Sequence, residues 1–303
     1  MNNHKLCLGT AQFGLDYGVA NKKGKPSLER AFEMLDFACE RGIRWFDTAQ
    51  AYGNAEEVLG EYLAHRGNLS EFHLISKLVP KGFDDAYECV FKDIEEAVLS
   101  SLKKLHIHAL EGFLFHTPDY IYREDLVEQM IRVREKELVR NIGVSIYETK
   151  HALDAARMEW VDYIQVPYSV FDQRLSHSDF FDLTRRTNKK VFARSAFLQG
   201  LTLMDVSDIP EGLEKAKGYV EELAALCIKY GLSRLEVSEL FSLNDERIAF
   251  FVFGGDSVPQ LKEVVEISER GDLPESLKKV LRERFADIER SVIMPNLWEI
   301  QRT

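Results

Sequence analysis

The amino-acid sequence predicts an α/β fold, a single (β/α)8 TIM barrel with parallel strands, and three observations support this prediction. Eight short apolar runs are spread along the 303 residues, and segments with helical periodicity separate them. The runs are continuously apolar rather than alternating, which is typical of parallel strands buried on both faces. No linker, low-complexity segment or repeat divides the chain, and a barrel of this kind uses about 250 residues as one unit. We therefore expect one domain over residues 1–303.

The expected strands follow one another with room for a helix after each. They are Lys5–Leu8, Arg44–Phe46, Leu74–Ser76, Leu110–Phe115, Asn141–Ser145, Tyr163–Val166, Val191–Ala193 and Ile248–Phe253. The interval between the last two is about twice the others, which predicts an extra helix in the late loops. Ser233 begins a capping box that would open one helix of this interval. We expect the C-terminal tail, from about residue 288, to pack near the rim of the barrel. An open doubly wound sheet is the competing fold, but residues 9–14 lack its GxGxxG spacing.

Composition and charge argue against several classes of protein. The chain has 39 Lys and Arg against 50 Asp and Glu, and this net charge of -11 argues against a nucleic-acid-binding surface. No apolar stretch approaches the length of a membrane span, and no signal segment precedes the first strand. The four cysteines, Cys7, Cys39, Cys89 and Cys227, form no CxxC pair. We therefore expect buried, reduced thiols in a cytoplasmic protein without a metal site. The sequence carries no signal for the oligomeric state.

Four chemically active residues fall at or near the ends of expected strands. Asp47, Lys77 and His116 each close an apolar run, and Tyr52 lies in the loop that follows Asp47. If these strands are parallel neighbours, the four side chains meet at the rim formed by the carboxyl ends of the strands, where barrels of this kind carry their active sites. An acid, a phenol, an ammonium and an imidazole on one rim make a proton-transfer site.

The phenol of Tyr52 is a weak acid at neutral pH, so a catalytic role requires help from its neighbours. We expect Lys77 to stabilise the phenolate and Asp47 to keep the buried Lys77 charged. His116 would hydrogen-bond a substrate oxygen. Together these groups would protonate a carbonyl oxygen while a hydride attacks its carbon. Because no side chain delivers a hydride, this chemistry requires a nicotinamide cofactor.

The sequence resembles the aldo-keto reductase family, and its opening resembles a bacterial aldo/keto reductase subgroup often associated with sugar pathways. The matching motifs run in order as Leu8–Gly14, Asp16–Gly18, Phe46–Gly53, Ser76-Lys77, Phe115-His116, Ile142–Ser145, Ile164-Gln165, Ala193–Ser195 and Gly254–Leu261. The resemblance implies a (β/α)8 barrel that reduces an aldehyde or ketone with NADP(H). It also implies Tyr52 as the general acid, with Lys77, Asp47 and His116 as its catalytic partners.

The resemblance further implies the residues that contact cofactor and substrate. At the cofactor they are Gly9, Thr10, Ala11, Asp47, Ser145, Gln165, Arg194, Ser195, Gly254, Asp256, Ser257, Gln260 and Glu263. At the substrate they are Phe13, Tyr52, His116, Tyr168 and Trp298. Within the first set, Ser145 and Gln165 would hold the nicotinamide carboxamide, and Ser195 would meet the diphosphate. The loop over residues 14–27 would fold over the rim as a lid, with Tyr17 lining the pocket.

Near the last strand the sequence departs from the family pattern in a way that concerns the cofactor. Asp256 and Gln260 stand where many members carry Lys or Arg. A carboxylate repels the 2′-phosphate of NADP(H) and can instead bind a ribose hydroxyl. Ser257 with Gln260 matches a capping box, and the helix N-terminus it would open suits a phosphate. The family favours NADP(H), and NAD(H) is the alternative.

Asp256 and two of three other departures, Ile146 and Val264, leave a second function open. Ile146 stands where many members have Asn, Arg194 where an aromatic residue usually stacks on the nicotinamide, and Val264 where an Asn often contacts adenine. A barrel with weakened catalysis and retained cofactor binding would act as a cofactor-sensing subunit bound to other proteins. A metal-dependent barrel such as a sugar isomerase is a third possibility, but only Asp47 and His116 stand out as ligands.

Overall fold

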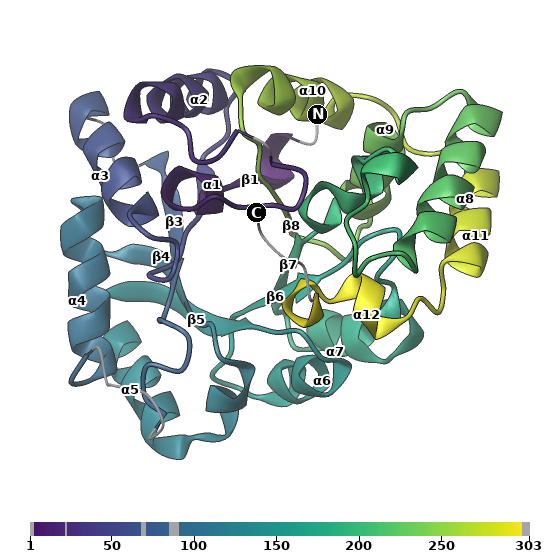
Figure 1. The fold of residues 1–303 in the computed structure, drawn as a ribbon. Helices are drawn as coiled ribbons and strands as arrows, with labels where there is room; N and C mark the ends of the chain where they lie inside the picture. Colours follow the sequence, from purple (N-terminus) through teal and green to yellow (C-terminus); the bar gives the residue numbers. More distant parts are fainter. Residues whose placement is uncertain (1–2, 22, 68–70, 85–90, 299–303) are drawn as a thin grey trace.

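Eight parallel strands form one closed barrel in chain order, and helices surround it (Figure 1). The computed structural model describes residues 3–21, 23–67, 71–84 and 91–298. The strands are β1 (Leu6–Gly9), β2 (Trp45–Asp47), β3 (His73–Lys77), β4 (Leu110–Phe115), β5 (Val139–Ser145), β6 (Tyr163–Pro167), β7 (Lys190–Arg194) and β8 (Phe250–Phe253). β1 pairs with both β2 and β8, which closes the sheet. The predicted (β/α)8 barrel is therefore confirmed, and each observed strand overlaps its predicted run.

Helices fill the intervals between the strands. They are α1 (Ala11–Gly14), α2 (Leu28–Glu40), α3 (Ala55–Arg66), α4 (Ile94–Leu105), α5 (Glu124–Glu135), α6 (Thr149–Arg157), α7 (Phe180–Arg186), α8 (Ala216–Tyr230), α9 (Arg234–Leu243), α10 (Val258–Ser268), α11 (Glu275–Arg284) and α12 (Arg290–Ile293). Both α8 and α9 lie between β7 and β8, which confirms the predicted extra helix. The predicted capping box opens α9, because Ser233 and Glu236 bond each other's backbone N–H groups. After α12, a 3-10 turn (Pro295–Leu297) lies beside the mouth of the barrel (Figure 1).

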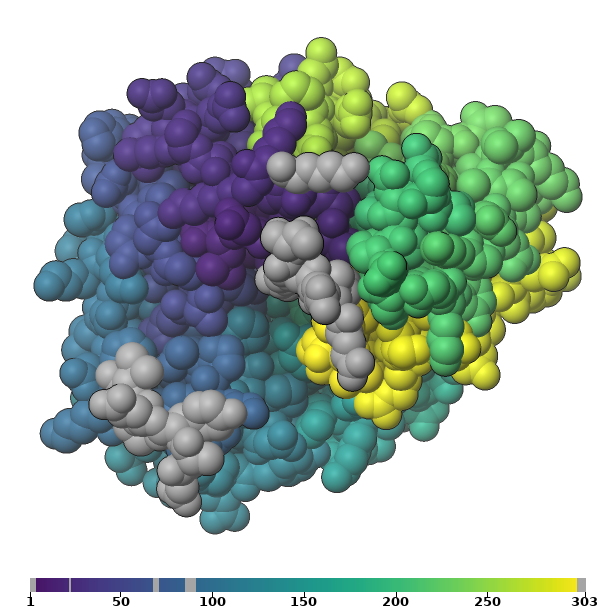
Figure 2. All heavy atoms as spheres, in the orientation of Figure 1, coloured from purple at the N-terminus to yellow at the C-terminus, as the bar shows by residue number. Residues whose placement is uncertain are grey.

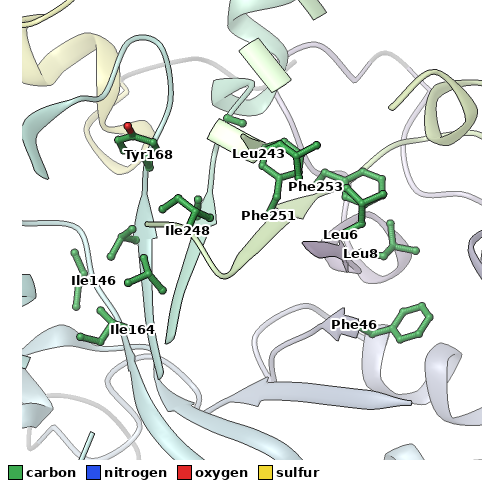
Figure 3. Close-up of a cluster of buried hydrophobic side chains, with 14 of the residues drawn as sticks. Leu6, Leu8, Phe46, Ile146, Ile164, Tyr168, Leu243, Ile248, Phe251 and Phe253 are labelled. Carbon is green, nitrogen blue, oxygen red and sulfur yellow. The ribbon is translucent and has the colours of Figure 1, made fainter. Parts of the chain in front are cut away.

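Alternate residues of the strands face the inside of the barrel and the surrounding helices. One apolar cluster joins Cys7, Ile75, Leu114, Tyr163, Phe192 and Phe250, and we place it inside the barrel. The residues between them, including Leu8, Phe46, Ile164 and Phe251, belong to the larger core that the helices cover (Figure 3). Side chains two residues further along share the inward face, and these are Lys77, His116, Gln165 and Arg194. The barrel is thus apolar at mid-height and polar at the carboxyl ends of its strands.

The described residues offer neither a membrane-spanning helix nor a metal cluster. No helix among them has the length and apolar character that crossing a bilayer requires. No group of three or more His, Cys, Asp or Glu side chains among them could hold a metal ion. Cys7, Cys39 and Cys227 are buried and free, whereas Cys89 lies outside the described residues.

Candidate active site

Asp47 and Lys77 form a buried ion pair at the carboxyl ends of β2 and β3. Lys77 Nζ lies 2.7 Å from Asp47 Oδ2 and donates a second hydrogen bond of 2.9 Å to the backbone oxygen of Thr48. Lys77 has no exposed surface, and Asp47 is 3% exposed. Bulk water solvates neither charge, so the attraction between the two charges offsets the free-energy cost of burying them.

Tyr52 lies against this ion pair. Its hydroxyl oxygen Oη is 3.5 Å from Lys77 Nζ, and the same ammonium lies 5.0 Å from the centre of the ring. Burial raises the pKa of Tyr52 above its ordinary value, the charge of Asp47 raises it further, and the charge of Arg194 lowers it. The expected stabilisation of a phenolate by Lys77 is therefore opposed by the neighbouring carboxylate. The phenol is protonated at neutral pH, so it can donate a proton or a hydrogen bond to an oxygen atom.

His116 follows β4 and lies edge-on to Tyr52, with the ring centres 5.9 Å apart. Burial lowers the pKa of His116 to about 3, and the positive charges of Lys77 and Arg194 lower it as well. Its Nδ1 atom is buried and has no hydrogen-bond partner among the residues described. A neutral imidazole with an unsatisfied nitrogen stands beside the phenol, which suits it to bind a polar atom of a ligand.

Ser145 and Gln165 extend the polar network from Asp47 to β5 and β6. Gln165 Nε2 donates to Asp47 Oδ1 at 2.7 Å, and Ser145 Oγ donates to Gln165 Oε1 at 3.4 Å. All three side chains are buried. Both ends of the Gln165 amide thus contact protein groups, and its second N–H and second oxygen lone pair are left for a ligand.

Arg194, the last residue of β7, reaches toward the end of β5. Its Nη2 donates to the backbone oxygen of Ile146 at 2.8 Å, and its Nη1 donates to Ser195 Oγ at 3.2 Å. The guanidinium carbon lies 4.4 Å from the centre of the Tyr147 ring. Among the residues described, no carboxylate pairs with this guanidinium. Arg194 therefore places a planar cation at the position where the family usually has an aromatic residue. The backbone carbonyl group of Ile146 holds this cation in place.

A cavity of about 390 Å³ joins Tyr52 to the end of β8. The predicted site residues that line it are Gly9, Ala11, Asp47, Tyr52, Arg194, Ser195, Gly254, Asp256, Gln260 and Glu263. Another part of the wall was not predicted from the sequence, and it includes Gln12, Phe197, Gln199, Gly200, Leu203, Met204 and Leu235. The ends of β1, β2, β7 and β8 thus share one hollow, with the protonated phenol inside it.

Two loops, one after β1 and one after β7, line this cavity and touch each other. Ala20 N donates to the backbone oxygen of Gln199 at 3.3 Å, and Tyr17 and Asn21 of the first loop also line the cavity. Gly200 has a φ of +95°, and a Cβ atom there would lie 2.5 Å from the Cβ of Ala20. Only glycine fits this approach without strain. In Figure 2 the N-terminal segments in purple and the segments after β7 in green flank the middle of one face.

The predicted capping box of Ser257 and Gln260 is wrong. Ser257 is the N-cap of α10, but its side chain accepts no hydrogen bond from the helix. Gln260 Oε1 instead accepts a hydrogen bond of 2.6 Å from the N–H of Asp256. Pro259 in the first turn has no N–H, which removes one of the donors that the Ser257 hydroxyl would use.

The other predicted site residues do not line the cavity, and they are Thr10, Lys77, His116, Ser145, Gln165, Ser257, Phe13, Tyr168 and Trp298. The three aromatic ones pack against protein. Phe13 is 1% exposed, and Tyr168 Oη donates to Asp245 Oδ2 at 2.7 Å from within the core. Trp298 Nε1 donates to the backbone oxygen of Val292 at 3.2 Å. These three side chains therefore form no part of the wall of this cavity, and their contact with a substrate stays a prediction.

Known proteins resemble this chain, some over most of its length and some over part of it. The model of the aldo/keto reductase family matches residues 5–281. The uncharacterized oxidoreductase YqkF of Bacillus subtilis (strain 168) is 25% identical over 298 residues, which are 92% of this chain and 95% of that protein. The methylglyoxal reductase DkgA of Escherichia coli O157:H7 is 31% identical over 128 residues, which are 41% of this chain and 43% of that protein.

Solved structures share the fold. The aldo-keto reductase AKR11C1 from Bacillus halodurans, in its holo form, superposes with a TM-score of 0.75 at 20% identity over 95% of both chains. An aldo/keto reductase from Klebsiella pneumoniae in complex with NADP and acetate gives a TM-score of 0.70 at 19% identity, over 94% of this chain and 93% of that one. Because the family model spans nearly the whole sequence and the fold agrees, the chain belongs to the aldo/keto reductase family.

Proposed function

We propose that the protein reduces a small aldehyde or ketone to an alcohol with a nicotinamide dinucleotide, and that Tyr52 is the general acid. The observation that carries this proposal is the protonated Tyr52 hydroxyl, which lines the cavity 3.5 Å from Lys77 Nζ. The name of one relative, a methylglyoxal reductase, supports a small carbonyl substrate, and the subgroup resemblance favours a sugar-derived one. The free, buried Cys7, Cys39 and Cys227 support a cytoplasmic location.

The residues of the cavity fit such a cofactor. Gly9 and Gly254 line it, and a Cβ atom at Gly254 would lie 2.4 Å from Gln12 Nε2, so the backbone itself forms this part of the wall. Arg194 and Ser195 offer donors for phosphate oxygens. Two solved structures with this fold hold NADP or NADPH, which supports the same class of cofactor here. When bound, a reduced nicotinamide supplies the hydride.

At the reacting end of the cavity, Tyr52 Oη would hydrogen-bond the carbonyl oxygen of the substrate. As negative charge develops on that oxygen, Tyr52 would transfer its proton to it. The phenolate left behind lies 3.5 Å from Lys77 Nζ, whose positive charge stabilises it. Asp47 pairs with Lys77 at 2.7 Å, and neutral His116 would offer a second polar contact to the substrate.

The proposal is tested by following the oxidation of NADH and of NADPH with a panel of aldehydes and keto-sugars that includes methylglyoxal. We expect turnover with at least one carbonyl compound, and we expect insensitivity to metal chelators. Tight binding of a nucleotide with no turnover of any compound would favour the second function, a cofactor-sensing subunit. Failure to bind either nucleotide would contradict both functions.

A further inference from the structure

Two carboxylates line the cavity at its β8 and α10 end. Asp256 follows β8 and is half-buried, and Glu263 lies on α10. Burial raises the pKa of Asp256, which means that its ionised form lacks part of the hydration it would have in water. Among the residues described, no side chain donates a hydrogen bond to either carboxylate. This end of the cavity therefore offers two acceptors that a ligand can satisfy.

Positive charge is scarce at the same end. Arg194 is the one cation among the described lining residues. Ile146 and Ser195 hold its guanidinium, and its charge acts on Tyr52 and His116. The charge of Lys23 acts on Asp256, but Lys23 is exposed to solvent on the first loop. An exposed ammonium contributes little electrostatic attraction, because water and salt screen it. Glu263 is exposed as well, so its charge is screened in the same way, and the half-buried carboxylate of Asp256 carries most of the negative charge at this end.

The N-terminus of α10 is also poorly equipped to bind a phosphate. A phosphate at a helix N-terminus is held by free backbone N–H groups. Here the N–H of Asp256 already donates to Gln260 Oε1 at 2.6 Å. Pro259 in the first turn has no N–H at all. Two backbone donors near this helix end are thus missing.

We infer that the protein prefers NAD(H) to NADP(H) and that Asp256 is the specificity-determining residue, an inference that rests on the proposed function. Reduction beside Tyr52 requires the nicotinamide at that end of the cavity, so the adenosine belongs at the end with Asp256 and Glu263. A 2′-phosphate there would place further negative charge against the half-buried carboxylate of Asp256, with the exposed Glu263 beside it. A free ribose hydroxyl would instead donate a hydrogen bond to a carboxylate, as in dinucleotide-binding folds that select NAD.

The experiment is a fluorescence titration of the nucleotide-free protein with NADH and with NADPH, which measures binding without turnover. We expect the Kd for NADPH to exceed that for NADH at least tenfold, which corresponds to about 1.4 kcal/mol. Asp256→Asn should lower this ratio at least threefold, mainly by tightening NADPH. Glu266→Gln is the matched control, because Glu266 is an exposed residue of α10 that does not line the cavity. This variant should leave the ratio unchanged.

The outcomes separate the two proposals. A wild-type ratio below tenfold, or an Asp256→Asn ratio equal to that of the wild type, would overturn the preference for NAD(H) and leave carbonyl reduction standing. If neither nucleotide binds, the proposed function itself is overturned.

Discussion

Replacing Glu239 should stabilise the protein at neutral and alkaline pH. Glu239 lies on α9 with no exposed surface, and neither carboxylate oxygen has a hydrogen-bond partner among the described residues. Burial raises the pKa of Glu239 to about 9, and the charge of Arg270 lowers it only partly. The folded protein therefore carries this side chain as the neutral acid.

The sign and size of the effect follow from proton binding. In the unfolded chain the carboxyl group has its ordinary pKa of 4.5. Between pH 4.5 and about 9 the unfolded chain releases a proton that the folded protein keeps. The free energy of unfolding therefore falls by about 1.4 kcal/mol for each pH unit in this window, a loss of about 3 kcal/mol by pH 7. Below pH 4.5 both states hold the proton, and the cost vanishes.

Urea unfolding of the wild type, Glu239→Gln and Glu239→Leu at pH 5 and at pH 8 measures this cost. Both variants should gain stability relative to the wild type between pH 5 and pH 8, and Leu should gain more than Gln because it also removes the unpaired polar group. Exposed Glu266→Gln serves as the control and should show no such gain. The reasoning is refuted if the difference between wild type and Glu239→Gln is the same at both pH values.

Three further predictions concern the candidate site. Lys77→Met leaves a buried carboxylate unpaired, so urea unfolding should show a loss of about 3–5 kcal/mol, and a loss under about 1 kcal/mol would contradict the buried ion pair. Gly200→Ala places a Cβ atom 2.5 Å from the Cβ of Ala20, so the two loops must separate and stopped-flow fluorescence should show faster nucleotide release. Gly218→Ala, where nothing lies within 4 Å of the added atom, should leave that rate unchanged, and equal rates in both variants would contradict the prediction. The ring of His116 should show no NMR titration between pH 5 and pH 9, because its pKa is lowered to about 3. The unfolded chain binds this proton near pH 6.5, so His116 should lower the stability as the pH falls from 6.5 toward 3.

The barrel and the polar rim were predictable because both follow from strand periodicity. Continuous apolar runs separated by helical segments indicate parallel strands, and their carboxyl ends must meet at one edge. Asp47, Lys77 and His116 end such runs, so their proximity did not depend on any loop. The same alternation also accounts for the burial of Tyr168 in the core. Gln165 faces the interior, and a residue three positions later faces the helices, where Tyr168 packs.

The wall of the cavity after β7 was not predictable in this way. Gln199 and Gly200 have φ values of 56° and 95°, so the chain there turns irregularly and carries no periodic signal. The capping interpretation of Ser257 failed for a related reason. A side chain caps a helix by accepting a hydrogen bond from a free backbone N–H group of the first turn. The proline in the first turn of α10 removes one of these N–H groups.

The proton donor assignment is tested most directly by Tyr52→Phe, which removes one oxygen atom. The rate of hydride transfer in a single turnover, measured with the best carbonyl substrate of the panel, should fall by a factor on the order of 10²–10⁴, while the Kd of the nucleotide stays unchanged. Tyr122→Phe is the control, because Tyr122 is exposed and bonds Asp154 outside the cavity. A Tyr52→Phe rate within tenfold of the wild type would contradict the assignment of Tyr52 as the general acid.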